Sequence, residues 1–114
     1  MSVKLTTRQV GDVTVIDAVG RITLGEGAST FRDTIRDLAS SGHKKMLINL
    51  GEVSYIDSSG IGELVSSYTA AKRAQGDLKL MKLSRAVDSA LLITKLYTVF
   101  DIHTDEATAV ASFT

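Results

Sequence analysis

Met46–Gly62, with the sequence MLINLGEVSYIDSSGIG, decides the fold of this chain. Met46–Leu50 is short and almost wholly apolar, which is typical of a strand that is covered on both faces, as in a parallel sheet. From Ser58 the period changes, because apolar side chains recur at helical spacing along one stripe: Ile61, Leu64, Val65, Tyr68 and Ala71. The segment therefore predicts a buried strand to Ile56, then a turn, then a helix that runs to Gly76.

The turn Asp57-Ser58-Ser59-Gly60 stands at the start of this helix. Serine and aspartate at a first turn can cap free backbone N–H groups, and the positive end of the helix dipole favours negative charge there. Gly60 and Gly62 leave the turn uncrowded, so that a partner could approach the serine hydroxyls closely. From local chemistry alone, the motif is either a helix cap or a site that accepts a phosphate.

Length, charge and composition restrict the class of protein. A chain of 114 residues predicts one domain over residues 1–114, with a single core. Thirteen basic residues balance thirteen acidic ones, so nucleic acid and anionic membranes are not expected partners. No apolar run of about 18 residues and no basic leader is present, which predicts a cytoplasmic protein. The chain has no cysteine, and His43 and His103 stand apart, so we expect no disulfide, metal or cofactor.

The region before Met46 predicts a hairpin and a helix. Residues 3–7 alternate between apolar and polar, as an exposed edge strand does, and 13–19 form a β-branched strand that ends at Gly20. Gly11-Asp12 supplies the turn between them. Helical spacing then runs over residues 26–41.

The region after Gly76 predicts two strands and two helices. The strands are expected over residues 78–82 and 99–102, and Ser84 is expected to cap the helix between them. A terminal helix begins near Thr104, with three residues expected to face inward: Ala107, Val110 and Ala111. The whole order predicts an α/β sandwich with a mostly parallel sheet of four or five strands, one antiparallel edge strand and about four helices.

Two enzymatic or phospho-acceptor alternatives fit the residues poorly. In an open α/β sheet the functional edge lies beyond the carboxyl ends of the parallel strands, where the Asp57 turn and the loop over residues 20–27 emerge. A hydrolase nucleophile elbow requires G-x-S-x-G, and Ile56 or Asp57 stands where its first glycine should be. A two-component receiver requires an acidic pair for Mg²⁺ after its first strand, and the candidate strand ends read Gly20-Arg21 and Arg8-Gln9.

Val53–Gly62 (VSYIDSSGIG) resembles the signature of stand-alone STAS domains of the anti-sigma factor antagonist family. The similarity covers almost the full chain and includes four further segments: Gly20-Arg21-Ile22, Gly76–Leu80, Ser84 with Val87, and Val99-Phe100 with Ile102. The complete Asp-Ser-Ser-Gly motif favours the antagonist type over stressosome scaffolds and lipid-transport subunits, which share the fold and remain alternatives.

The resemblance implies a phosphorylation site and a set of partners. In that family the serine directly after the aspartate is phosphorylated, which places the site at Ser58 and gives Asp57, Ser59, Gly60 and Gly62 supporting roles. The unmodified antagonist binds a serine-kinase anti-sigma factor, so that a sigma factor is released. Phosphorylation ends the interaction and a PP2C-type phosphatase resets it. The resemblance implies a binding module rather than an enzyme.

The partner surface is expected where two segments meet at the sheet edge. Its expected contact residues are Leu24, Gly25, Ala28 and Ile61, since both segments follow parallel strands and combine small residues with an available apolar side chain. Thr23 is a departure from the resemblance, because many family members carry an acidic residue at that position.

Overall fold

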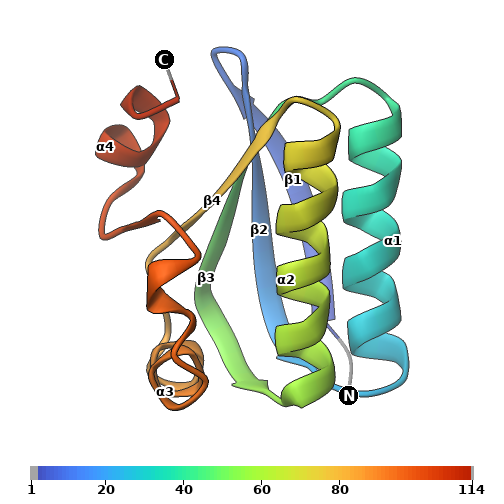
Figure 1. Cartoon of the computed structure of the whole chain (residues 1–114), viewed down its shortest axis with the longest axis vertical. Coiled ribbons are helices and arrows are strands. Elements are labelled where there is room, and N and C mark those ends of the chain that lie inside the picture. Colours follow the sequence, from blue (N-terminus) through green and yellow to red (C-terminus); the bar gives the residue numbers. More distant parts are fainter. Residues whose placement is uncertain (1–2, 114) are drawn as a thin grey trace.

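A computed structural model describes residues 3–113, and a five-stranded sheet in the order β1-β2-β3-β4-β5 forms its centre (Figure 1). The strands are β1 (Val3–Val10), β2 (Val13–Ile22), β3 (Lys45–Ile56), β4 (Asp77–Met81) and β5 (Ile102–His103). β1 pairs with β2 in antiparallel orientation, and every other neighbouring pair is parallel. The predicted α/β fold with one antiparallel edge strand is confirmed.

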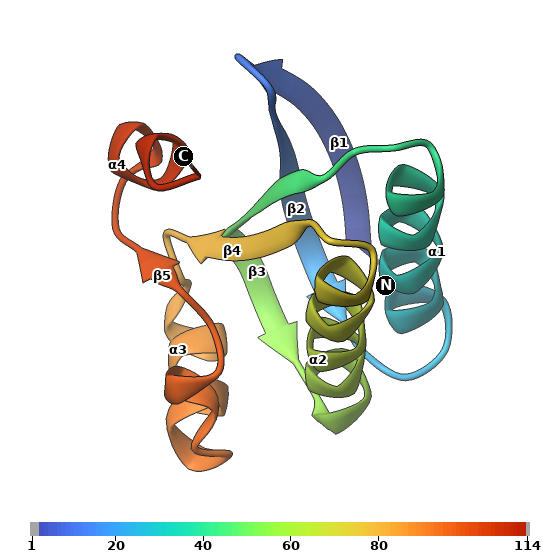
Figure 2. The same ribbon diagram turned by 45° about the horizontal axis from the view of Figure 1, so that its top comes forward.

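Helices cover both faces of this sheet, but unequally. They are α1 (Glu26–Ser40), α2 (Ser58–Arg73), α3 (Arg85–Ile93), the short 3-10 helix η1 (Leu96–Thr98) and α4 (Glu106–Ala111). In Figures 1 and 2, α1 and α2 run side by side along the sheet, whereas α4 lies apart from them. Within residues 3–113, no helix is both long and apolar enough to span a bilayer.

The first half of β3 is buried on both faces, because alternate side chains of a strand enter different layers. Ile48 belongs to the main core, which also contains residues of α1, α2 and α3: Phe31, Ile35, Leu64, Val87 and Leu91. Leu47 belongs to a smaller core with residues at the chain end: Ala109 and Phe113. The predicted two-sided burial of Met46–Leu50 is confirmed, except that Asn49 is only half-buried.

The second half of β3 is covered on one face only. Glu52, Ser54 and Tyr55 are exposed, whereas Val53 and Ile56 are buried. The register between β2 and β3 shifts twice in this half, so β3 carries extra residues and its buried side chains come three apart instead of two. The predicted burial of this strand through to Ile56 is therefore correct for the face that carries Val53 and Ile56, and it is wrong for the opposite face.

Charged side chains attach α4 to the sheet. Arg8 on β1 donates a hydrogen bond from Nε to Asp17 Oδ2 at 2.7 Å. Its Nη1 donates to Glu106 Oε2 at 2.9 Å. Asn49 on β3 donates to Asp17 Oδ1 at 2.8 Å. The Arg8 guanidinium holds the pKa of Asp17 below its ordinary value, and it does the same for Glu106. The network therefore connects three strands to the first turn of α4.

Three predicted boundaries are wrong near the sheet edges. β2 continues past Gly20 to Ile22, since its pairing with β3 extends to Ile56. α2 ends at Arg73 rather than at Gly76. The last strand is Ile102–His103 instead of residues 99–102, because Phe100 is buried with its ring edge-on to Tyr68, 5.4 Å between centroids. Packing of this aromatic side chain takes the place of strand pairing.

The inward side of α4 agrees with the prediction in part. Val110 is half-buried and packs against the smaller core, as predicted, whereas Ala107 and Ala111 are exposed. Ala109 is fully buried, and Phe113 just beyond the helix is 6% exposed. These two residues are four apart, which places them on one side of a helical turn. In a helix of six residues, the neighbouring Phe113 therefore determines which side faces the sheet.

Candidate functional site

The Asp57 turn lies at the predicted edge of the sheet, between the end of β3 at Ile56 and the start of α2 at Ser58. Ile22 pairs with Ile56, so the β2–α1 loop leaves the sheet beside this turn. Figure 1 shows both connections at the same end of the molecule. The structure thus brings together the two segments that the sequence predicts to meet.

Asp57, rather than a serine, is the N-cap of α2. Its backbone is extended, and its Oδ1 accepts a hydrogen bond from Gly60 N at 3.0 Å. Ser58 is the first helical residue, and its side chain is exposed. Among residues 3–113 its hydroxyl has no hydrogen-bond partner. The capping function is therefore separate from the Ser58 hydroxyl, which is free to react without uncapping the helix.

The second carboxylate oxygen of Asp57 reaches across to the other segment. Leu24 N donates to Asp57 Oδ2 at 2.9 Å, so one carboxylate joins the β2–α1 loop to the start of α2. The N–H groups of Leu24 and Gly60 favour the ionised form and hold the pKa of Asp57 below its ordinary value. Asp57 therefore connects the two segments that form the candidate site.

We expect the contribution of Asp57 to stability to disappear in acid. Its pKa is lower in the folded protein than in the unfolded chain, where it is about 3.9, so the unfolded chain binds protons more readily. In urea melts, the free energy of unfolding of the wild-type protein should exceed that of the Asp57→Asn variant. Above about pH 5 this difference should be constant. That difference should shrink as the pH falls through the folded pKa of Asp57. A difference still undiminished at about pH 3 would contradict this assignment.

The two glycines of the motif have different surroundings. A Cβ on Gly60 would overlap the carbonyl oxygen of Ile22 and lie 2.6 Å from Ile56 Cγ1. A Cβ on Gly62 would meet no atom within 4 Å. The absence of a side chain at Gly60 therefore permits α2 to approach β2, whereas at Gly62 it keeps the surface beside Ser58 open to another molecule.

Two of the four predicted partner contacts face solvent, and two do not. Leu24 is 79% exposed, and Gly25 is exposed with a φ of 95°. Ala28 is 6% exposed and Ile61 is 7% exposed, because both lie on the sides of α1 and α2 that pack inward. These two side chains are displayed far less than that of Leu24, and their contact with a partner stays a prediction.

Three exposed residues beside the site were missed by the sequence reasoning. Val19 and Tyr55 are each 49% exposed, on the part of the sheet that α4 does not cover. Arg21 pairs in register with Tyr55, and its guanidinium lies 5.2 Å from the centre of the Tyr55 ring. Strand alternation could not have placed Tyr55, because the register shifts in β3 break the two-residue period there, and the extent of α4 over that face could not be read from the pattern either.

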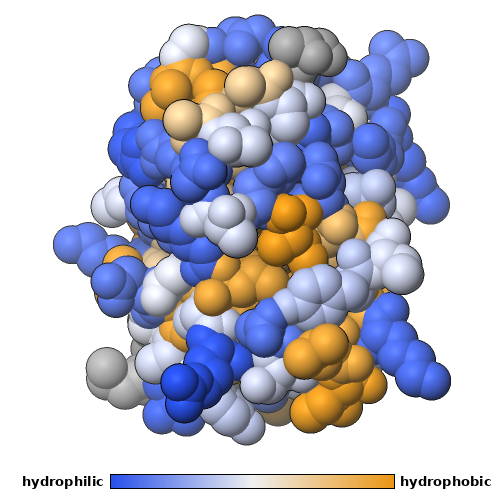
Figure 3. All heavy atoms as spheres, turned by 90° about the vertical axis from the view of Figure 1, so that its left-hand side faces the viewer, coloured by the Kyte–Doolittle hydropathy of each residue, from blue (hydrophilic) through white to orange (hydrophobic). Residues whose placement is uncertain are grey.

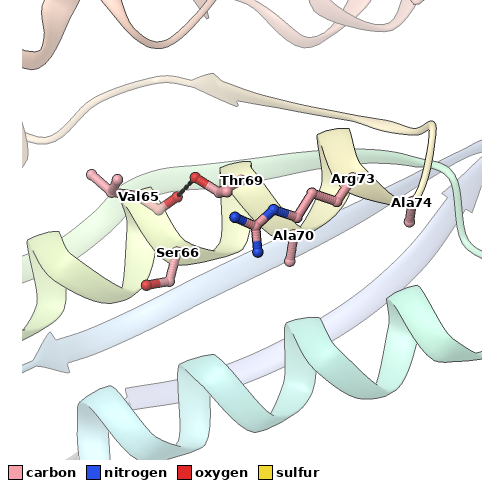
Figure 4. Close-up of a pocket in the computed structure, with 6 residues that line it drawn as sticks. All are labelled: Val65, Ser66, Thr69, Ala70, Arg73 and Ala74. Atoms are coloured by element: carbon pink, nitrogen blue, oxygen red, sulfur yellow. Dashed lines mark hydrogen bonds between the residues drawn. The ribbon is translucent and has the colours of Figure 1, made fainter.

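A shallow hollow of about 590 Å³ lies further along α2 (Figure 4). It is lined by Val65, Ser66, Thr69, Ala70, Arg73 and Ala74. Thr69 Oγ1 donates to Val65 O at 3.0 Å, so this hydroxyl serves the helix backbone. Within the described residues, no three acidic or histidine side chains gather into a metal-binding group. Ser58 does not line the hollow and is displayed on the open surface.

A separate apolar patch lies where α3 ends and η1 follows. Leu92, Ile93 and Val99 are 62%, 82% and 36% exposed. Figure 3 shows apolar side chains gathered low on the face that carries α3. Val87 and Leu91 are buried, so α3 is apolar both toward the core and toward solvent. Exposed apolar patches often mark contact surfaces, and this one is distinct from Leu24.

Comparison with known proteins gives consistent results. A model of the STAS domain matches residues 4–109. The anti-sigma-B factor antagonist of Bacillus subtilis is 30% identical over 102 residues, which are 90% of this chain and 92% of the relative. The fold resembles that of an anti-sigma factor antagonist from Mycobacterium paratuberculosis, with a TM-score of 0.87, 18% identity, and coverage of 98% of this chain and 94% of that one. It also resembles the Bacillus cell fate determinant SpoIIAA in its phosphorylated form, with a TM-score of 0.74, 18% identity, and coverage of 96% and 98%.

Proposed function

The chain belongs to the STAS domain family, and from this premise we propose that it is an anti-sigma factor antagonist whose binding is switched by phosphorylation of Ser58. In this proposal the unmodified protein binds a serine-kinase anti-sigma factor in the cytoplasm and thereby frees a sigma factor. The kinase ends the interaction by phosphorylating Ser58, and a PP2C-type phosphatase restores the unmodified form.

The observation that carries the proposal is the exposed Ser58 hydroxyl at the capped start of α2. Asp57 already caps the helix, so modification of Ser58 removes no hydrogen bond that the described residues make. Leu24 and the open surface at Gly62 lie on the two segments that Asp57 joins. A partner seated here would contact the hydroxyl, an apolar side chain and a surface without side-chain obstruction.

The same arrangement supports a switch in binding rather than a change of fold. A phosphate adds a charge of about −1.5 to −2 and three acceptor oxygens. Asp57 already accepts from Gly60 N, so a phosphate on Ser58 would meet a carboxylate at the helix start instead of a free Gly60 N–H group. The phosphate would therefore remain on the surface, where it changes the size and charge that the partner meets.

The surroundings of the histidines support binding rather than catalysis. His43 Nδ1 is 2.7 Å from Thr14 Oγ1, and His103 Nε2 is 3.2 Å from Asp101 Oδ1. Neither ring is hydrogen-bonded to Ser58, so neither is placed as a general base for that hydroxyl. The relative from Bacillus subtilis carries the name of an antagonist, which supports an anti-sigma factor as the partner.

The test is phosphorylation by the kinase-type anti-sigma factor of the same genome, with ATP. The wild-type protein should gain one phosphate, which should map to Ser58 by tandem mass spectrometry. The matched control, Ser59→Ala, should be phosphorylated to the same extent as the wild type. Ser58→Ala should bind in the presence of ADP and gain no phosphate. Ser58→Asp should bind about tenfold more weakly or worse, since each 1.4 kcal/mol of lost complementarity is tenfold in affinity. Phosphate on Ser59 alone, or equal affinity of the phosphorylated protein, would exclude this switch.

A further inference from the structure

The two segments of the proposed partner surface belong to different elements. Leu24 lies in the loop between β2 and α1, and Ser58 begins α2 after β3. Their direct side-chain connection is the Asp57 carboxylate, which accepts from Gly60 N with Oδ1 and from Leu24 N with Oδ2. We propose that Asp57 is a positioning residue, which fixes Leu24 relative to Ser58 so that a partner meets both as one preformed surface. This inference rests on the proposed function.

The hydrogen bond matters because little else holds Leu24. Its side chain is 79% exposed, and a Cβ on the adjacent Gly25 would touch nothing within 4 Å. The carbonyls of Thr23 and Gly25 accept from Ala28 N at 2.8 Å and from Ser29 N at 3.0 Å, which attaches the loop to α1, and directly before the loop Asp57 N donates to Ile22 O at 3.3 Å. The Leu24 N–H is thus the point at which the loop tip is attached to α2. A loop held before binding loses less conformational entropy when the partner arrives.

The chemistry of the position requires a carboxylate and not merely a helix cap. Asparagine and serine also cap helices well, but each presents one side-chain oxygen to the first turn. An ionised aspartate presents two, and here each accepts from a different element. Asp57→Asn can keep the bond to Gly60, whereas its NH₂ group would face the Leu24 N–H as a second donor. The variant therefore separates the capping function from the connection to the loop.

Amide hydrogen exchange measured by NMR tests the connection without any partner. In the free protein, Asp57→Asn should raise the exchange rate at Leu24 by about tenfold or more, because the Leu24 N–H group loses a hydrogen bond to a charged acceptor, which is one of the stronger kinds. Rates in the α2 interior should rise by no more than the loss of global stability, measured by urea melts, accounts for. Asp105→Asn is the matched control, because Asp105 caps α4 in the same way, accepting from Thr108 N at 2.9 Å. It should leave Leu24 unaffected.

A double-mutant cycle tests the consequence for binding. Asp57→Asn should weaken binding of the kinase-type anti-sigma factor about fivefold to tenfold in the wild-type background. In the Leu24→Ala background it should weaken binding by less than about twofold, because the side chain that Asp57 positions is gone. Asp57→Ser, which keeps a capping oxygen, should behave like Asp57→Asn.

The outcomes separate this inference from the proposed function. If Asp57→Asn leaves exchange at Leu24 unchanged, or weakens binding equally in both backgrounds, then Asp57 does not position Leu24 and the inference is wrong. If no variant and no wild-type protein binds such an anti-sigma factor, the proposed function is wrong, and the claim that Asp57 presents Leu24 to this partner is wrong with it. The exchange rates then still decide whether Asp57 fixes the loop.

Discussion

Gly60→Ala should lower the free energy of unfolding by about 3 kcal/mol or more, which is a large fraction of the stability of a domain of this size. The added methyl group would overlap the Ile22 carbonyl oxygen, which belongs to the end of a paired strand. It would also lie 2.6 Å from Ile56 Cγ1, so neither the helix nor the strand has space into which to relax. Urea denaturation followed by circular dichroism measures the change.

Gly62→Ala is the matched control for this substitution. It lies in the same helix, but no atom stands within 4 Å of its Cβ position. Alanine is more favourable than glycine inside a helix by about 0.8 to 1 kcal/mol, so this variant should be slightly more stable than the wild type. Equal effects of the two substitutions would mean that Gly60 is not a close-packing position.

Gly62→Arg should weaken binding of the anti-sigma factor by about 100-fold or more, with the melting temperature nearly unchanged. The proposed interface has no side chain at this position, and a long cation there would hold the partner away from Ser58. A 100-fold loss corresponds to about 2.7 kcal/mol, as expected when several contacts fail together. Surface plasmon resonance or calorimetry measures the affinity, and a thermal melt measures the fold.

Two variants control for the added charge and for the change at residue 62. Ser40→Arg places the same side chain on an exposed residue at the far end of α1, and it should bind normally. Gly62→Ala should weaken binding far less than Gly62→Arg. If Gly62→Arg keeps the wild-type affinity, the partner contacts another part of the surface.

Most of the secondary structure could be predicted, because local signals agree with the tertiary fold. The alternation in β1, the turn at Gly11 and the capping serine at Ser84 each depend on a few neighbouring residues. The errors fall on residues whose position depends on distant contacts. Phe100 packs on Tyr68, and Phe113 decides how α4 lies on the sheet. Neither contact leaves a periodic trace in the sequence.

The sequence by itself determined the α/β order, the helix that starts at Ser58, and the position of that start at the functional edge of the sheet. These follow from hydrophobic period and from turn residues, which act over a few positions. Only the tertiary structure decided that Asp57 is bonded to Leu24, that Gly60 lies against Ile22, and that Ala28 and Ile61 are buried. Each of these depends on how closely separate elements approach one another, and local sequence patterns carry no measure of that distance.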